Sequence, residues 1–232
     1  MVASKSPSFG ASLGRGEFST SRGGCVTEAN SIREESGSSA TALRQVAIDP
    51  NFVLDESHHA WLVFGSFWSG IKLRRLDDRT GMAGSPQIYS LATRRQPDNA
   101  PAAPPGLPPN WEAIEAPFIV HHGRCYYLFV SWDLCCRGIH STYRTMVGRS
   151  THITGPYVDD QGVPMMQGGG TPLLSGNSRW LGPGGESVVM QPSDQDIIAF
   201  HAYDAHSGFP ALQISTLVWR NGWPRATLSD QP

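Results

Sequence analysis

Apolar and aromatic residues recur along the chain in short runs separated by polar, Gly-containing or Pro-containing turns. The three most pronounced runs cover residues 60–68, 125–133 and 196–204. A second run follows each of them, at residues 70–77, 143–150 and 211–219. Runs of this length that are rich in β-branched and aromatic residues predict β-strands. The 3.6-residue period of an amphipathic helix is almost absent.

The strand pattern repeats along the chain. An apolar strand, a polar turn, an aromatic strand, a loop and a further strand follow one another three times, at a spacing of roughly 65 residues. The 25 Gly and 18 Pro residues supply the turns that many short strands need. We therefore predict an all-β protein made of β-propeller blades, with about three blades present. A β-sandwich whose strands resemble one another by chance is the alternative.

Two segments interrupt this pattern. Residues 1–45 are rich in Ser, Gly and Thr, which predicts either an irregular N-terminal segment or the remnant of a further, second blade. The Pro-rich residues 94–111 are predicted to link two blades. The propeller domain is expected to cover residues 46–232.

Composition and charge narrow the classes of partner. The 232 residues are 39% hydrophobic, enough for a core. The formal net charge of −2 and the pI of about 6.4 provide no basic surface for a phosphate backbone, so nucleic acid is not expected as a partner. No apolar segment reaches the roughly 20 residues of a membrane helix, and residues 1–21 lack the apolar core of a signal peptide.

The cysteines and histidines show no metal-binding spacing. Two of the four cysteines, Cys135 and Cys136, are adjacent, which fits neither a zinc motif nor a dense disulfide framework, so the cysteines are expected to be buried small residues. No ligand spacing relates the histidines either, and none is assigned to a metal; these are His121, His122, His201 and His206.

Two carboxylates stand at matched places in neighbouring repeats. Asp49 precedes Pro50, and Glu115 lies two residues before Pro117, in each case where an apolar strand begins. Strand starts of successive blades converge on the propeller axis, so these side chains are expected to meet. A carboxyl that is partly buried beside a negative charge keeps its proton to higher pH, as a general acid requires. The alternative is that each side chain only binds backbone amides at a strand start.

At these residues the sequence resembles glycoside hydrolase family 43, and the endo-1,5-α-L-arabinanases in particular. The likeness rests on "AIDPNF", "WLVFGSFWSGIKL" and "IEAPFIVHHGRCYYLFVSWDLCCRG", and continues through "HAYDAHSG" and "LVWRNGWP". It covers about residues 45 to 225. The resemblance implies a five-bladed β-propeller that hydrolyses α-1,5-linked arabinan with inversion at the anomeric carbon, and a secreted enzyme.

The resemblance also implies roles for individual residues. Glu115 matches the general acid, and Asp49 matches the carboxylate that raises the pKa of the acid and orients it. Substrate contacts are implied for five further residues, and these are Ala47, Ile48, Ser66, Phe67 and Trp68. Val46 stands where the family commonly has an Asn, which leaves one polar contact unaccounted for. A family metal site commonly uses a His after "GPG", where this chain has Gly185, so no metal and no other cofactor is expected.

The third carboxylate of the family has no counterpart that we identify. An inverting glycosidase needs a general base about 6.5–9.5 Å from the acid. No Asp precedes Asp49, and the acidic residues there lie in no matching motif; they are Glu17, Glu28, Glu34 and Glu35. The chain is therefore expected to be the C-terminal part of an arabinanase, without the first blade and its base.

Three functions remain open from the sequence. The first is an arabinan endo-hydrolase, inactive as this chain. The second is an exo-acting arabinofuranosidase or xylosidase of the same family, and the third a non-catalytic carbohydrate-binding propeller. In each case the expected partners are arabinan or arabino-oligosaccharides.

Overall fold

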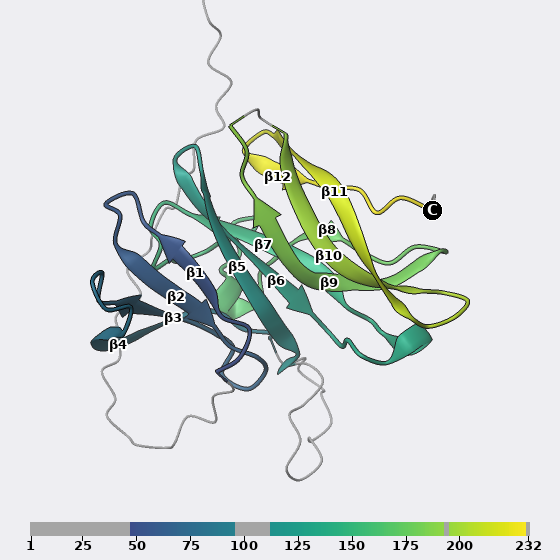
Figure 1. Ribbon diagram of the computed structural model, residues 1–232, viewed down its shortest axis with the longest axis horizontal. Coiled ribbons are helices and arrows are strands. Elements are labelled where there is room, and N and C mark those ends of the chain that lie inside the picture. The colour runs from purple at the N-terminus through teal and green to yellow at the C-terminus, as the bar shows by residue number, and fades with distance from the viewer. Residues whose placement is uncertain (1–46, 96–111, 193–194, 231–232) are drawn as a thin grey trace, which may run out of the picture.

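The computed structural model describes residues 47–95, 112–192 and 195–230, and its strands form three four-stranded antiparallel sheets (Figure 1). The first sheet holds β1 (Asn51–Leu54), β2 (Ala60–Phe64), β3 (Ile71–Leu76) and β4 (Ala83–Ala92). The second holds β5 (Ile114–His122), β6 (Cys125–Trp132), β7 (Arg144–Ser150) and β8 (Thr171–Leu174). The third holds β9 (Trp180–Val189), β10 (Asp196–Asp204), β11 (Pro210–Arg220) and β12 (Trp223–Arg225).

Within each sheet, strands that are consecutive in sequence pair side by side. The helical content of the described residues is confined to short 3₁₀ turns such as η2 (Gly138–His140) and η3 (Met165–Gln167). Three four-stranded meanders in succession are blades of a propeller, so the all-β prediction with about three blades is confirmed. Residues 1–45 and most of the predicted 94–111 link lie outside the described residues.

One predicted strand is too long. The run 60–68 was expected to be a single strand, but β2 ends at Phe64. Gly65 has φ +128°, and a Cβ there would lie 2.7 Å from the carbonyl oxygen of Gly70. Phe67 and Trp68 follow with φ of +53° and +50°. The chain therefore turns sharply after β2, and Ser66 to Trp68 form a loop at the end of the sheet.

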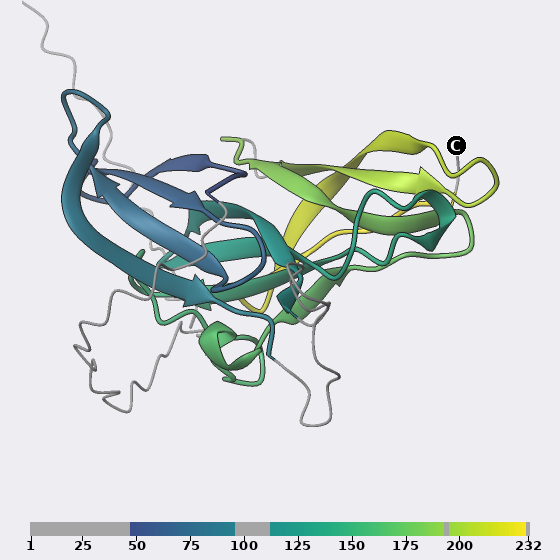
Figure 2. The same cartoon turned by 90° about the horizontal axis from the view of Figure 1, so that it is seen from below.

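The second sheet packs between the other two (Figures 1 and 2). Its strand β6 is buried along its whole length. Alternate residues of β6 point to opposite faces, so Leu128 joins the apolar cluster shared with the first sheet and Phe129 joins the cluster shared with the third. This double burial explains why β6 reads as an unbroken apolar run.

The outer sheets carry apolar residues that no described residue covers. Phe52 and Leu54 are exposed on β1, and Leu212 and Ile214 are exposed on β11. Contiguous apolar residues on a surface are typical of a contact with another polypeptide. No helix in the described ranges has the length and apolar character that crossing a membrane requires.

Candidate active site

The site is built around Glu115, the second residue of β5. The pairing of β5 with β6 shifts register between Glu115 and Phe118, and Ala116 has φ +52° within this bulge. Pro117 has no amide hydrogen and is therefore tolerated where the ladder is interrupted. The bulge frees the Ala116 amide from the ladder and re-aims the neighbouring side chain, as bulges at functional sites do.

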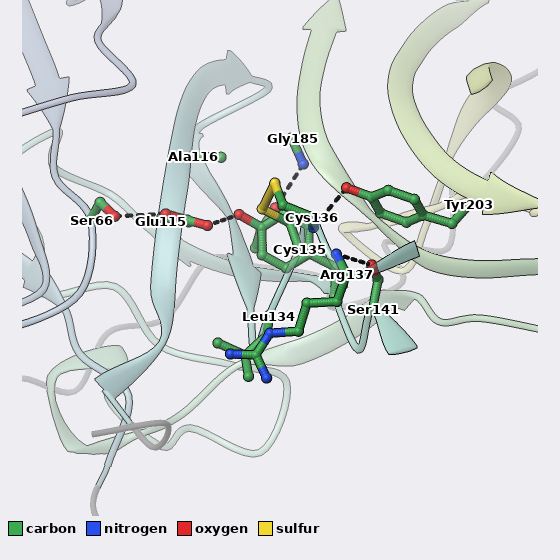
Figure 3. Close-up of a disulfide and its surroundings, with 12 residues drawn as sticks. Ser66, Glu115, Ala116, Leu134, Cys135, Cys136, Arg137, Ser141, Gly185 and Tyr203 are labelled. Atoms are coloured by element: carbon green, nitrogen blue, oxygen red, sulfur yellow. Dashed lines mark hydrogen bonds between the residues drawn. A yellow bond between two sulfur atoms is a disulfide. The ribbon is translucent and has the colours of Figure 1, made fainter. Parts of the chain in front are cut away.

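Both oxygens of the Glu115 carboxyl have a hydroxyl partner. Ser66, in the loop after β2, donates its hydroxyl to Oε2 at 2.6 Å, as Figure 3 shows, and the Tyr143 hydroxyl donates to Oε1. Burial raises the pKa of Glu115, and the negative charge of Asp49 adds to this rise, whereas the Ser66 bond opposes it. The raised pKa favours the protonated form of Glu115, and the two hydroxyls fix the position from which the proton would be given, as a general acid requires.

Asp49 lies beside this carboxyl, at the start of the first sheet. Its backbone φ is +56°, and its Oδ2 accepts a hydrogen bond of 3.1 Å from the Ala116 amide. Asn51 makes a similar bond, in which its Oδ1 accepts from the Ile119 amide at 3.0 Å. The sequence left two interpretations of Asp49 open, an electrostatic effect on Glu115 and binding of a backbone amide at a strand start. In the structure Asp49 does both. The structure brings Asp49 and Glu115 together, and their catalytic roles stay predictions.

A cavity of about 240 Å³ opens next to these groups. Its wall includes Asp49, Asn51, Ala116 and Phe118 from the first two sheets and Gly185 and Glu186 from β9. The cavity therefore lies where the three sheets converge, which is where a propeller places a ligand.

The other residues with implied substrate contacts differ from one another in exposure and in hydrogen bonding. Ala47 and Ile48 are exposed just before Asp49. Ser66 is buried, and its hydroxyl is bonded to Glu115. Phe67 donates its amide to the carbonyl oxygen of Ile114 at 2.8 Å, so the loop that carries Phe67 and Trp68 is docked beside Glu115. These contacts with sugar remain expectations.

Glu186 was missed by the sequence reasoning. Its side chain is 4% exposed, and Oε2 accepts hydrogen bonds from Ser131 at 2.8 Å and Thr145 at 3.4 Å. Burial raises the pKa of Glu186 to about 7, although the Ser131 bond opposes the rise. Its Oε1 is buried without a partner among the described residues. Glu115 was singled out because it is a carboxylate within a predicted apolar strand. The same signal would have identified Glu186.

The residues present do not fit the metal site that the resemblance implies. Gly185, at the position of the implied His, has no side chain to offer and has φ +63°. A Cβ there would lie 2.9 Å from Nδ1 of His201, so a larger residue would displace that imidazole. The described ranges contain no group of three or more His, Cys, Asp or Glu residues suited to a metal. We derive no catalytic step through a metal.

The histidines lie in separate places. Nε2 of His121 is 3.3 Å from Oε1 of Glu56, and His122 stacks on Trp219 with ring centroids 3.8 Å apart. His201 lies on β10 with its ring 5.8 Å from that of Tyr143, and burial lowers its pKa. His206 is an exposed residue beyond β10.

The cysteines differ from expectation. Cys135 and Cys136 form a disulfide between adjacent residues, shown in Figure 3, and Cys136 is exposed. Cys125 is disulfide-bonded as well. The prediction of buried small residues is confirmed for Cys125, which is buried, and wrong for Cys135 and Cys136, which form a disulfide that reaches the surface. It failed because pairing of adjacent cysteines requires an unusual backbone, here with φ +64° at Cys136, that composition does not reveal.

Comparisons with known proteins agree on one family. The sequence profile of "Glycosyl hydrolases family 43" matches residues 19–224. "Extracellular endo-alpha-(1->5)-L-arabinanase 1" of Bacillus subtilis (strain 168) is 44% identical over 207 residues, which cover 89% of this chain and 57% of that protein. "Extracellular exo-alpha-(1->5)-L-arabinofuranosidase ArbA" of Cellvibrio japonicus (strain Ueda107) is 42% identical over 182 residues, or 77% of this chain and 51% of that protein.

Solved structures give the same result. The GH43 endo-arabinanase from Bacillus licheniformis superposes with a TM-score of 0.68 at 46% identity, and the match covers 80% of this chain and 58% of that one. An exo-1,5-alpha-L-arabinanase from a bovine ruminal metagenomic library superposes with a TM-score of 0.70 at 36% identity, covering 85% and 60%. The chain spans little more than half the length of the curated relatives it matches.

Proposed function

The chain belongs to glycosyl hydrolases family 43, and we propose that it binds α-1,5-linked arabinan and protonates the glycosidic oxygen during inverting hydrolysis. The observation that carries the proposal is the Glu115 carboxyl, which Ser66 and Tyr143 hold in place and whose pKa is raised by burial and by Asp49. The relatives named as arabinanases support arabinan as the substrate class.

In the proposed reaction, Glu115 gives its proton to the oxygen of the leaving sugar as the bond to the anomeric carbon breaks. Burial raises the pKa of Glu115 and the Asp49 charge adds to this rise, which favours the protonated form that this step needs. Water attacks from the opposite face and must lose a proton to a base. We assign this base to none of the described residues, because Glu186 is buried and Asp49 is bonded to the amide next to the acid.

We therefore propose that the 232-residue chain alone cleaves arabinan slowly and that azide accelerates it. Azide is an anion that attacks the anomeric carbon without losing a proton, so its attack needs no general base. The products are a glycosyl azide of inverted configuration and a sugar whose oxygen carries the proton from Glu115. The test is the release of products from debranched arabinan by the purified chain, with and without azide. Binding of arabinohexaose is measured in parallel by calorimetry.

The outcomes separate the candidate functions. Binding with azide-dependent cleavage supports the proposal, and binding without any cleavage selects the carbohydrate-binding alternative. Absence of binding and cleavage contradicts both. The similarity to exo-acting relatives makes exo cleavage the second candidate. An endo mode gives a ladder of oligosaccharides, whereas an exo mode releases one small product from the start.

Replacing Asp49 by Asn is expected to move the basic limb of the pH–rate profile to lower pH. The Asp49 charge raises the pKa of Glu115, so its removal lets Glu115 lose its proton at lower pH. The profile is measured as azide-assisted cleavage between pH 4 and 9. Asp160→Asn is the matched control, because Asp160 is exposed and does not act on the Glu115 pKa. An unmoved basic limb would remove Asp49 from its proposed role.

We also propose that the chain acts outside the cell. Both curated relatives above are named as extracellular. The disulfide of Cys135 with Cys136 and the disulfide bonding of Cys125 support this location, because disulfides persist in oxidising compartments.

A further inference from the structure

The disulfide between Cys135 and Cys136 lies at the proposed active site. It belongs to the segment between β6 and η2. Figure 3 shows its surroundings, which include Glu115, Ala116 and Gly185. Ala116 and Gly185 also line the cavity beside Glu115. Cys135 is half-buried and Cys136 is exposed, so the disulfide reaches solvent on this side of the molecule.

The strand register explains this position. Ser131, near the end of β6, pairs with Glu115, and the amide of Asp133 donates to the carbonyl oxygen of Ala113. The segment that carries the disulfide therefore leaves β6 at the end where β5 begins. The segment ends at Tyr143, whose hydroxyl donates a hydrogen bond to Glu115. Both ends of the segment thus contact the start of β5.

Hydrogen bonds fix the segment internally and to the third sheet. The Cys136 amide donates to the hydroxyl of Tyr203, on β10, at 2.8 Å, and the Arg137 amide donates to the Ser141 hydroxyl at 3.0 Å (Figure 3). The Thr142 amide also donates to the carbonyl oxygen of Leu134 at 2.8 Å. The disulfide is therefore held in place before any ligand binds.

Stabilisation of the fold is a weak explanation for this disulfide. A cross-link stabilises a protein mainly by restricting the unfolded chain, and the gain grows with the length of the loop that it closes. Cys135 and Cys136 are separated by one position, so they close the shortest loop possible. The gain from chain entropy is correspondingly small, and a role at the surface must account for the pair.

The chemistry of the pair suits contact with a sugar ring. Two bonded sulfur atoms are polarisable, uncharged and without a hydrogen-bond donor, so they pack against carbon-bound hydrogens as methionine sulfur does. The ring that joins adjacent cysteines has no free rotamers, so it loses little conformational entropy when a ligand binds. A furanose ring offers such hydrogens on its faces, while its hydroxyls remain free to bind polar groups.

We propose that the Cys135–Cys136 disulfide is a contact surface for an arabinofuranose ring bound next to Glu115. This inference rests on the proposed function, because it takes arabinan as the ligand. The disulfide is a binding surface and stays oxidised throughout.

The test is arabinohexaose affinity in a Glu115→Gln background, which prevents turnover. The double substitution Cys135→Ser with Cys136→Ser is expected to raise the Kd by about 3- to 10-fold, because flexible hydroxyls replace a fixed apolar surface. Asp160→Asn is the matched control, since it changes an exposed polar residue outside the disulfide-bearing segment and outside the wall of the cavity. Its Kd is expected to stay within about twofold of the background. Circular dichroism establishes that each variant is folded.

A second measurement uses the chain with its disulfides intact. With cysteine labelled by ¹³C at Cβ, arabinohexaose is expected to shift the signals of Cys135 and Cys136 and to leave that of Cys125 in place. This result does not depend on whether the double variant folds. If arabinohexaose binds, leaves the Cys135 and Cys136 signals unshifted and binds the folded double variant equally well, the inference is wrong. If the parent does not bind arabinohexaose, the proposed function itself fails.

Discussion

Replacing Glu115 by Gln is expected to lower azide-assisted cleavage of debranched arabinan by about 10²- to 10⁴-fold, the usual contribution of a general acid. Gln keeps the size of the side chain and can still accept the Ser66 hydrogen bond, but it has no proton to give. The leaving sugar must then depart as an alkoxide. Azide supplies the nucleophile in both proteins, so the ratio of rates does not depend on a general base.

Two comparisons make this prediction specific. Glu112→Gln is the matched control, because Glu112 is a nearby, half-buried carboxyl whose pKa burial also raises, and its loss is expected to leave the rate unchanged. A 4-nitrophenyl arabino-oligosaccharide has a leaving group that needs no proton, so Glu115→Gln is expected to slow its cleavage far less. Equal losses on both substrates would show that Glu115 acts through structure, and no loss on arabinan would sink its assignment as the acid.

Replacing Glu186 by Gln is expected to abolish much of the pH dependence of stability between pH 4.5 and 7. Burial raises the folded-state pKa of Glu186 to about 7 from 4.5, so in this window the folded state binds more protons than the unfolded state. The free energy of unfolding therefore falls as pH rises. The stabilisation from protonated Glu186 is fully present below the pKa of Glu186 in the unfolded state and is lost as pH rises through its folded-state pKa. The loss is on the order of 3 kcal/mol between pH 4 and 8, since one pKa unit corresponds to about 1.4 kcal/mol.

Urea unfolding of the parent and of Glu186→Gln, at pH steps across this window, checks the prediction. The parent is expected to lose stability steadily, and the variant to lose much less, because Gln does not titrate. Glu115 contributes a loss of the same sign, since burial also raises its pKa, so some slope remains in the variant. Asp160→Asn, which changes an exposed carboxylate, is expected to follow the parent. Parallel curves for the parent and Glu186→Gln would show that Glu186 is ionised in the folded state.

The blade pattern was predictable because it rests on local alternation and turns. The predicted strand at 196–204 agrees with β10, and the predicted run at 125–133 agrees with β6 to one residue. The prediction that the strand continues after Phe64 was wrong, because positive φ values at Gly65, Phe67 and Trp68 turn the chain. The side chains of this segment are nevertheless typical of a strand. Backbone constraints of this kind are invisible to hydrophobic periodicity.

Only those site residues that a local sequence pattern marks could be predicted. Asp49 and Glu115 were paired because each stands before a proline at a strand start. The hydrogen bonds to Glu115 come from Ser66 and Tyr143, which are 49 and 28 positions away. No local pattern specifies such pairings, because they depend on how the sheets dock and how the disulfide-bearing segment runs. The pairing of Cys135 with Cys136 was missed for a related reason, since it depends on backbone conformation.

The acid is assembled from two sheets, and this has a consequence for how the chain matures. Asp49 directly precedes the first sheet and Ser66 lies in the loop after its strand β2, whereas Glu115 lies on β5 of the second sheet and Tyr143 directly precedes β7. A partly folded chain with all strands formed but the sheets loosely docked would show native far-ultraviolet circular dichroism and an unoriented carboxyl. Proton donation by Glu115 therefore requires the docked interface between the first two sheets, and formation of the strands alone does not provide it.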